Sequence, residues 1–221
     1  MPSPDPAPPP EILLYDWDNT LVDGWAGITA ALNAVFAAFG RPLWRADETR
    51  ARVRVSLAES FPAMFGAEWE RARDIFYATL KGEHLRHLRL MPGVEALLAA
   101  GGRWPQGVVS NKAGAFLRAE VTHLGWDGHF RAVIGAGDAA ADKPDPAPLH
   151  LALRKMGAEV GPHVWYIGDT ALDMQAARAA GCRPVLLGDA NHDGGIARAA
   201  PELQFADGHA LAAYLMQNWP L

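Results

Sequence analysis

Short apolar runs, each ended by polar residues, alternate along this chain with longer segments whose apolar residues recur at helical spacing. The runs lie at residues 12–15, 108–109, 133–134, 164–167 and 184–187. Runs of this kind are typical of buried strands, and the steps between the later ones match the length of a strand-helix unit, roughly 30 residues. The pattern predicts an α/β fold with a doubly wound parallel sheet.

A much longer interval separates the first run from the second, and it reads as an insertion. Apolar residues recur there at three- and four-residue steps over residues 25–39 and 61–80, and the Gly-Arg-Pro at 40–42 ends the first of these helices. We expect the aromatic residues of these stripes to fill a small helical bundle. The expected organisation is a core domain of residues 11–22 and 89–221, an α-helical insert at 23–88 and an extended proline-rich tail at 1–10.

Polar clusters follow four of the predicted strands. They are Asp16-Trp17-Asp18-Asn19-Thr20, Ser110-Asn111-Lys112, Lys143-Pro144-Asp145-Pro146 and Gly168-Asp169-Thr170-Ala171-Leu172-Asp173. Right-handed crossovers would bring these strand ends to one edge of a parallel sheet, where ligands bind. Several carboxylates close together need a cation or a proton, and Mg²⁺ is the natural neutraliser because it is held by one or two carboxylates with waters and substrate phosphate.

In this order the clusters resemble the four motifs of the haloacid dehalogenase-like (HAD) superfamily, and the resemblance spans nearly the whole chain. Ser110-Asn111-Lys112 and the Lys143-Pro144-x-Pro146 form are similar to the phosphoglycolate phosphatase-like branch. The resemblance implies a HAD-like Rossmannoid core and an inserted, mobile helical cap. It also implies a Mg²⁺-dependent phosphatase, a phosphoric monoester hydrolase, that acts through an aspartyl-phosphate intermediate.

By this resemblance, Asp16 is the nucleophile that attacks phosphorus, and Asp18 is the general acid and then the general base. The presence of Asp18 argues against the dehalogenase branch. The metal ligands would be Asp16, Asp18 through its backbone carbonyl, and Asp169. Asp173 would be a water-mediated ligand or a partner of Lys143. The simpler alternative for Asp169 and Asp173 is an acidic cap near the positive end of a helix dipole.

Phosphate contacts are expected from the hydroxyls of Thr20 and Ser110 and from the ammonium of Lys143. Asn111 is a further candidate through its side-chain amide, whereas Lys112 fits a solvated face equally well. Taken alone, Thr20 is also compatible with a helix N-cap and Ser110 with a turn.

Two residues depart from the commoner family pattern. Trp17 is expected to point away from the ligand and to pack in the core. Asn19 stands where glycine is common, and asparagine tolerates a left-handed backbone better than most residues.

Composition limits the remaining possibilities. The 221 residues carry a formal net charge of -5, which provides no electrostatic footprint for nucleic acid or an anionic membrane. No apolar run is long enough for a membrane span. Cys182 is the only cysteine, which is compatible with a reducing cytoplasm, and the start of the chain lacks the pattern of a signal peptide. Both a monomer and a homodimer remain open.

The expected substrate is a small phosphorylated metabolite, either phosphoglycolate-like or a sugar phosphate, and Arg52 and Arg54 of the insert are candidates for its recognition. A charged helix surface is the commoner fate of such arginines. A phosphomutase of the phosphoglucomutase-like kind and a pyrophosphatase are alternatives on the same fold. An alternative of another class is a phospho-receiver-like regulatory module, against which the long insert and Asp18 both argue.

Overall fold

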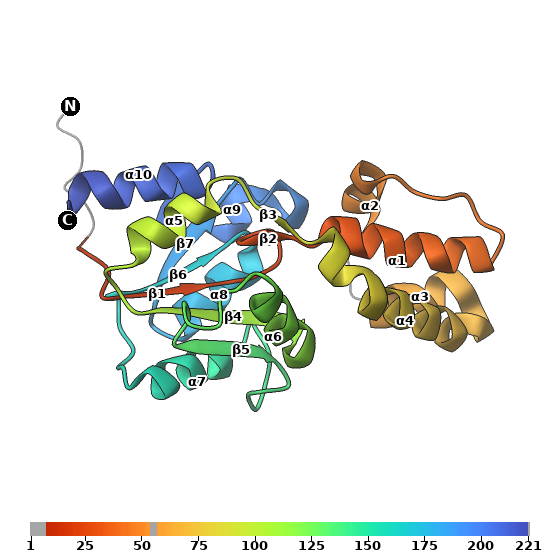
Figure 1. Cartoon of the computed structure of the whole chain (residues 1–221), viewed down its shortest axis with the longest axis horizontal. Helices are drawn as coiled ribbons and strands as arrows, with labels where there is room; N and C mark the ends of the chain where they lie inside the picture. The colour runs from red at the N-terminus through yellow and green to blue at the C-terminus, as the bar shows by residue number, and fades with distance from the viewer. Residues whose placement is uncertain (1–7, 54–56, 221) are drawn as a thin grey trace. The chain divides into compact units, whose positions relative to one another are not determined.

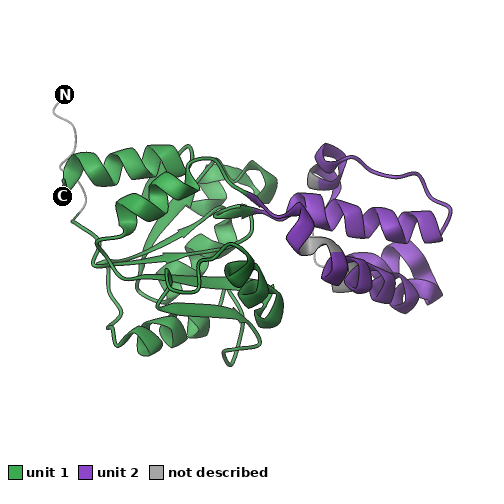
Figure 2. Cartoon of the chain, in the orientation of Figure 1, with its two compact units in different colours: residues 1–22, 90–221 green, residues 23–89 purple. Residues whose placement is uncertain are grey.

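The computed structural model describes residues 8–53 and 57–220 of the chain. It divides into two compact units (Figure 2). The first combines Met1–Val22 with Leu90–Leu221, and the second is Asp23–Arg89. Arg54 and most of the proline-rich segment 1–10 lie outside the described residues.

A six-stranded sheet forms the centre of the first unit (Figure 1), and every strand pair recorded in it is parallel. The strand order is β5-β4-β1-β6-β7-β8. The strands are β1 (Ile12–Tyr15), β4 (Gln106–Ala113), β5 (Ala132–Ala136), β6 (Val164–Gly168), β7 (Arg183–Leu187) and β8 (Leu203–Phe205). The order reverses direction at β1, so the first polar cluster lies at the topological switch point where ligands bind in such sheets.

Side-chain alternation along β1 assigns its residues to the two faces of the sheet. Ile12 and Leu14 join a buried cluster with residues of α7 and α8. Leu13 and Tyr15 instead approach Gly101 of α5, where an added Cβ would come within 2.8 Å and 3.0 Å of them. Both faces of the sheet are therefore covered by helices, and the doubly wound α/β prediction is confirmed.

The helices of the first unit follow the strands in the expected alternation. They are α5 (Val94–Gly101), α6 (Gly114–His123), α7 (Ala147–Met156), α8 (Ala171–Ala179), α9 (Gly195–Ala199) and α10 (Gly208–Asn218), with a 3₁₀ turn η2 (Asn191–Asp193). The aromatic rings of Trp165 and Tyr214 are in contact, which places α10 against β6. Strand β8 and the short α9 were not predicted from the sequence, because they carry only three and five residues.

The second unit is helical and has its own core. Its elements are α1 (Trp25–Ala38), α2 (Ala46–Arg52), α3 (Leu57–Phe65), the 3₁₀ turn η1 (Gly66–Glu68) and α4 (Trp69–His87). Phe36, Phe61 and Phe76 are buried together there, as the aromatic stripes predicted. Helix α1 ends just before Gly40, whose φ of 64° suits glycine, in agreement with the predicted stop.

A two-stranded ribbon lies where the chain leaves the first unit and where it returns. It pairs β2 (Val22–Asp23) with β3 (Arg89–Leu90). Next to it, the backbone N–H of Met91 donates to the carbonyl of Leu21 at 3.0 Å. The ribbon was not predicted, since two-residue strands leave no periodic signal in the sequence.

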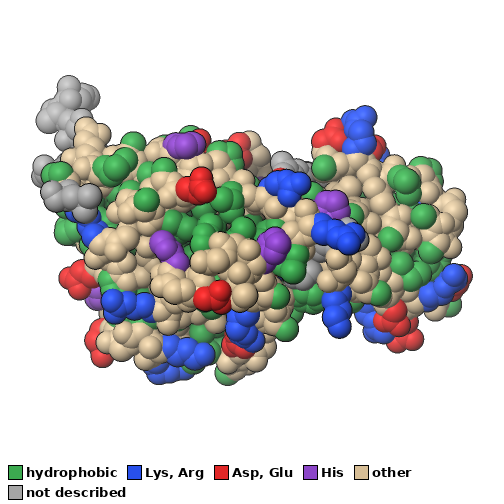
Figure 3. Space-filling view, viewed as in Figure 1, with side chains coloured by type: hydrophobic (Ala, Val, Ile, Leu, Met, Phe, Trp, Pro, Cys, Tyr) green, Lys and Arg blue, Asp and Glu red, His purple; other side chains and the backbone are tan. Residues whose placement is uncertain are grey.

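Two surface properties bear on function. Within the described residues, no helix is long and apolar enough to cross a membrane. On the face drawn in Figure 3, Lys and Arg side chains are interspersed with Asp and Glu and do not gather in one basic patch.

Candidate active site

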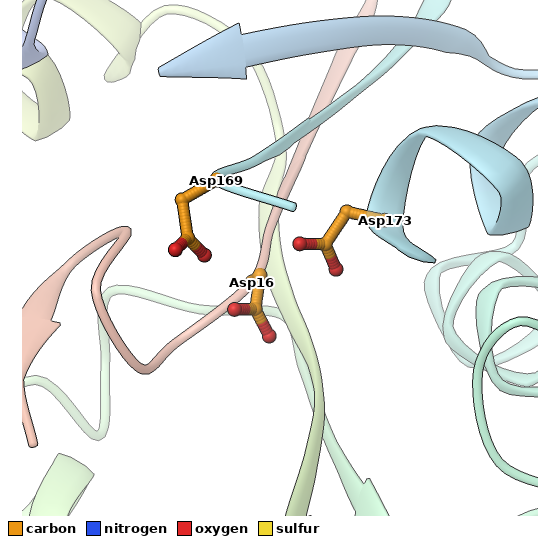
Figure 4. A group of neighbouring side chains, drawn as sticks. All are labelled: Asp16, Asp169 and Asp173. Carbon is orange, nitrogen blue, oxygen red and sulfur yellow. The ribbon is translucent and has the colours of Figure 1, made fainter. Parts of the chain in front are cut away.

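Three buried carboxylates converge at the carboxyl edge of the sheet. Asp16, Asp169 and Asp173 each offer an oxygen, and these oxygens lie within 4.8 Å of one another. Figure 4 shows the three side chains pointing toward one another from the end of β1, the end of β6 and the start of α8. The residues are only 6%, 5% and 1% exposed. The sequence therefore predicted correctly that acids from distant motifs meet at one edge.

Regular structure fixes the positions of Asp16 and Asp173. Asp16 extends the even-numbered face of β1, and its backbone N–H donates to the carbonyl of Ile167 at 2.8 Å. Thr170 and Asp173 form a capping box at the start of α8, in which the Asp173 backbone N–H donates to Thr170 Oγ1 at 3.2 Å. Asp173 is therefore a helix cap as well as a member of the cluster.

Gly168 allows Asp173 to come this close. A Cβ added at Gly168 would lie 2.5 Å from both Cβ and Cγ of Asp173. Contacts of that length do not occur between real side chains, so any other residue at the end of β6 would displace either the strand or the acid.

Lys143 bridges two of the carboxylates. Its Nζ donates to Asp16 Oδ1 at 2.6 Å, to Asp173 Oδ1 at 2.7 Å and to the hydroxyl of Tyr166 at 2.8 Å. Tyr166 in turn donates to the backbone carbonyl of Val109 at 2.8 Å. The Lys143 side chain is 3% exposed, so the ammonium depends on these partners for its solvation.

Asn111 supports Lys143 from the backbone side. Its amide nitrogen donates to the carbonyl of Lys143 and its amide oxygen accepts from the N–H of Lys143, both at 2.9 Å. Asn111 was expected to contribute its amide near the phosphate. Here both ends of that amide bind the backbone of Lys143, which lies in the loop between β5 and α7.

The charges of the cluster do not balance. Burial raises the pKa of Asp16, and the negative charges of Asp173 and Asp169 raise it further. The Lys143 ammonium lowers this pKa, but by less than burial raises it. Burial also raises the pKa of Asp169. Burial alone would lower the pKa of Lys143, but Asp16 and Asp173 hold it well above the usual value. Three carboxylates thus face one ammonium, and a divalent cation would favour their charged forms.

Thr20 and Ser110 place hydroxyls near the acids. Thr20 Oγ1 donates to Asp169 Oδ1 at 3.3 Å. The chain reaches Thr20 through Asn19, whose φ of 63° is the left-handed conformation expected there. Ser110 lies on β4, and its Oγ accepts from the backbone N–H of Lys112 at 3.2 Å. Thr20 is not a helix N-cap, because the next helix begins at Trp25 after Gly24.

Asp18 has a different environment from the other acids. Its Oδ1 accepts from Lys112 Nζ at 2.8 Å, and the same ammonium donates to Glu120 Oε1 and Oε2 at 2.8 Å and 2.7 Å. The Lys112 side chain is 15% exposed, so the solvated-face alternative is wrong. Burial lowers the pKa of Lys112, but Asp18 and Glu120 reverse this and raise it overall.

Trp17 is fully buried, as expected for a packing residue. It also has a polar role that was not predicted, because its Nε1 donates to Glu120 Oε2 at 2.6 Å. The alternation of β1 explains this position, since Trp17 follows Leu13 and Tyr15 on the face opposite Asp16.

Sequence reasoning missed three residues near the acids: Glu120, Tyr166 and His192. His192 Nε2 lies 3.2 Å from Asp169 Oδ2. Glu120 carried a signal, because it is an acid on the same face of α6 as the buried Leu117. Tyr166 carried none, since a tyrosine inside an apolar strand looks like any core residue. Asp193 was not predicted either, and its Oδ2 accepts from the backbone N–H of Ala171 at 2.9 Å at the start of α8.

Arg52 lies on α2 and contacts its own unit. Its guanidinium lies 4.9 Å from the ring centroid of Trp44 and 3.4 Å from Glu48. These contacts match the charged-surface alternative, and Arg54 is outside the described residues.

Comparison with known proteins agrees with this geometry. A sequence model of the haloacid dehalogenase-like hydrolases matches residues 13–187. A phosphoglycolate phosphatase of Yersinia pestis is 32% identical, over 76% of this chain and 76% of that protein. Phosphoglycolate phosphatase 1 of Pseudomonas aeruginosa is 30% identical, over 88% of this chain and 75% of that protein.

The fold has solved relatives as well. A haloacid dehalogenase-like hydrolase from Streptococcus pneumoniae aligns with a TM-score of 0.80 and 22% identity, covering 93% of this chain and 98% of that one. At this identity the likeness concerns the fold.

Proposed function

The chain belongs to the haloacid dehalogenase-like hydrolase family and is a phosphatase, and we propose that it hydrolyses a small phosphorylated metabolite with Mg²⁺ through an aspartyl-phosphate on Asp16. The cluster of Asp16, Asp169 and Asp173 with Lys143 is the observation that carries the proposal. A phosphoryl group has several charged oxygens, and such a cluster supplies both an ammonium and a place for a cation beside it.

The donor set fits Mg²⁺. Asp16 and Asp169 offer hard carboxylate oxygens, and the unbalanced negative charge at the site favours a divalent ion. The backbone carbonyl of Asp18 is the third ligand that we propose, with Asp173 acting through water or through Lys143. When bound, the ion neutralises phosphate charge and so lets an anionic nucleophile approach phosphorus.

In the first step an Asp16 carboxylate oxygen forms a bond to phosphorus as the bond from phosphorus to the leaving oxygen breaks. Asp18 gives its proton to that oxygen, and the alcohol leaves. Lys143, Thr20 and Ser110 hold the phosphoryl oxygens during the transfer.

In the second step Asp18, now a carboxylate, takes a proton from water as the water oxygen bonds to phosphorus. The bond between phosphorus and Asp16 breaks, inorganic phosphate leaves, and both acids return to their starting forms. Asn111 contributes by fixing the backbone of Lys143.

We propose that the second unit is a cap that selects the substrate. A helical cap favours small molecules, and phosphoglycolate or a sugar phosphate fits this requirement. Phosphoglycolate also agrees with the names of the similar proteins. Arg52 and Arg54 remain candidates for recognising an anionic substrate.

A phosphate-release screen tests the proposal. The protein, freed of metal with a chelator, is assayed on phosphoglycolate, sugar phosphates, other small esters and pyrophosphate, with and without Mg²⁺. We expect release from a small ester only when Mg²⁺ is present. Full activity in the metal-free sample would count against the carboxylate cluster as a metal site.

Analysis of the organic products and of the protein's phosphorylation state in the same reactions separates the alternatives. Isomerisation of a sugar phosphate without net phosphate release would indicate a phosphomutase, and preference for pyrophosphate would indicate a pyrophosphatase. A stable phosphorylated Asp16 would indicate a phospho-receiver-like module.

A further inference from the structure

A buried chain of polar contacts runs from Trp17 through Glu120 and Lys112 to Asp18, outside the metal cluster. We propose that Lys112, anchored by Glu120 and Trp17, is a positioning residue that holds the Asp18 carboxyl group for proton transfer to the leaving oxygen. The inference rests on the proposed acid and base role of Asp18.

All the hydrogen-bond donors of the Lys112 ammonium are used in these contacts. An ammonium has three protons, and Lys112 Nζ donates to three oxygens: Asp18 Oδ1 and both oxygens of Glu120, all within 2.8 Å. It therefore has a single preferred position, and the carboxylate of Asp18 is tied to it.

Glu120 lies between Trp17 and Lys112, in the buried part of this chain of contacts. Its side chain is 1% exposed on α6, where an unpaired carboxylate would be very unfavourable. Trp17 Nε1 donates to it at 2.6 Å. The Trp17 ring packs edge to face against Trp126 and Phe130, at 5.9 Å and 6.5 Å between ring centroids. Aromatic packing thus supports the indole in the position from which it donates to Glu120.

The tether leaves part of Asp18 available for chemistry. The Asp18 side chain is 31% exposed, and among the described residues its Oδ2 has no hydrogen-bond partner. One oxygen is therefore held by Lys112 while the other can exchange a proton with a leaving group or a water.

Lys112 also links the Ser110 hydroxyl to the Asp18 carboxyl group. Its backbone N–H donates to Ser110 Oγ at 3.2 Å, so one lone pair of that hydroxyl is occupied and its proton can be donated to a phosphoryl oxygen. A single residue on β4 thus orients a phosphate-binding hydroxyl through its backbone and the acid through its side chain.

A purely structural role would be to neutralise Glu120 in the core, and a double-mutant cycle separates the two roles. Lys112→Met, Asp18→Asn and the double variant are assayed with Mg²⁺ on an alkyl phosphate found to be hydrolysed and on p-nitrophenyl phosphate, whose leaving group needs little protonation. Lys155→Met removes an exposed lysine as the matched control. Lys112→Met/Glu120→Gln removes both buried charges and keeps an acceptor for Trp17, so we expect it to keep the wild-type fold.

We expect Lys112→Met and Lys112→Met/Glu120→Gln to lower kcat on the alkyl ester by roughly 10- to 100-fold, which is part of the rate enhancement that a positioned proton-transfer group provides. The loss should be much smaller on p-nitrophenyl phosphate, with KM little changed. Lys112→Met should add nothing in the Asp18→Asn background, since it acts through Asp18.

Additive losses, equal losses on both esters, or a change confined to KM would overturn the inference while leaving the proposed mechanism in place. If Asp18→Asn itself lost the same factor on both esters, the acid role of Asp18 would fail and the inference with it. If the wild-type protein released phosphate from none of the small esters screened with Mg²⁺, the proposed function would fail first.

Discussion

At the scale of single residues, Asp16 has the position that a nucleophile needs. It is buried, bound to Lys143 and aligned with two further acids. Asp16→Asn should lower kcat by roughly 10⁴- to 10⁶-fold, because an amide can neither attack phosphorus nor neutralise a cation. Its oxygen still accepts from Lys143, so the unfolding midpoint should stay close to that of the wild type. Activity near the wild-type level in purified Asp16→Asn would refute the nucleophile assignment.

Loss of Lys143 should lower the stability of the protein. Lys143→Met leaves Asp16 and Asp173 buried without their ammonium, and breaking a buried pair in this way costs about 3–5 kcal/mol. Mg²⁺ should recover part of the loss, because it can neutralise the same carboxylates. Urea unfolding with and without Mg²⁺ measures both effects, with Lys155→Met as the exposed control. A loss below about 1 kcal/mol would contradict a buried ion pair at this position.

The sequence predicted which residues meet but not all of their contacts. Asp16, Asp169, Asp173 and Lys143 could be brought together because each follows a recognisable strand, and parallel strands end at one edge. The partners of Lys112 could not be found in this way. Glu120 is eight positions away on α6, and only the packing of that helix against the sheet decides whether the two side chains meet.

At the scale of elements, the junction between β6 and α8 places two of the three acids. Gly168→Ala should displace Asp173, since the new methyl group would lie 2.5 Å from its Cβ and Cγ. We expect weaker Mg²⁺ dependence and a kcat at least about tenfold lower, as small misplacements of a site can cost that much or more. Gly128→Ala is the matched control, because an added Cβ there has nothing within 4 Å. Unchanged kcat and Mg²⁺ dependence in Gly168→Ala would show that Asp173 tolerates displacement.

Element prediction succeeded where apolar runs alternate with segments of helical period. Five strands of the six-stranded sheet, all except β8, and the aromatic stripes of the insert form as expected. The β2–β3 ribbon and β8 are two or three residues long, so their existence depends on partners far away in the sequence.

At the scale of the whole molecule, the chain contains two units with separate cores. The cluster formed by β1, β6, α7 and α8 shares no residue with the aromatic cluster of the second unit. The fold class of each unit followed from the sequence because each has its own hydrophobic period. Which residues of the second unit would contact a substrate did not follow from the sequence, because recognition depends on side chains that carry no periodic signal.

This division predicts that the first unit folds without the second. Leu21 and Met91 are joined by a backbone hydrogen bond, so a short Gly-Ser linker can replace residues 23–89 without separating the ends of the gap. The shortened chain should unfold cooperatively and keep the near-ultraviolet circular dichroism of the fully buried Trp17 and Trp165. It should still hydrolyse p-nitrophenyl phosphate with Mg²⁺, because the proposed catalytic groups all belong to the first unit.

Discrimination among substrates should be lost in that shortened chain. If the second unit selects the substrate, kcat/KM for the preferred metabolite should fall toward the values for other small esters, while the value for p-nitrophenyl phosphate changes little. The same deletion carrying Asp16→Asn is the control for contaminating phosphatase, and it should be inactive. A folded core that still preferred the same metabolite would show that recognition lies in the first unit, since no residue of the insert would remain to provide it.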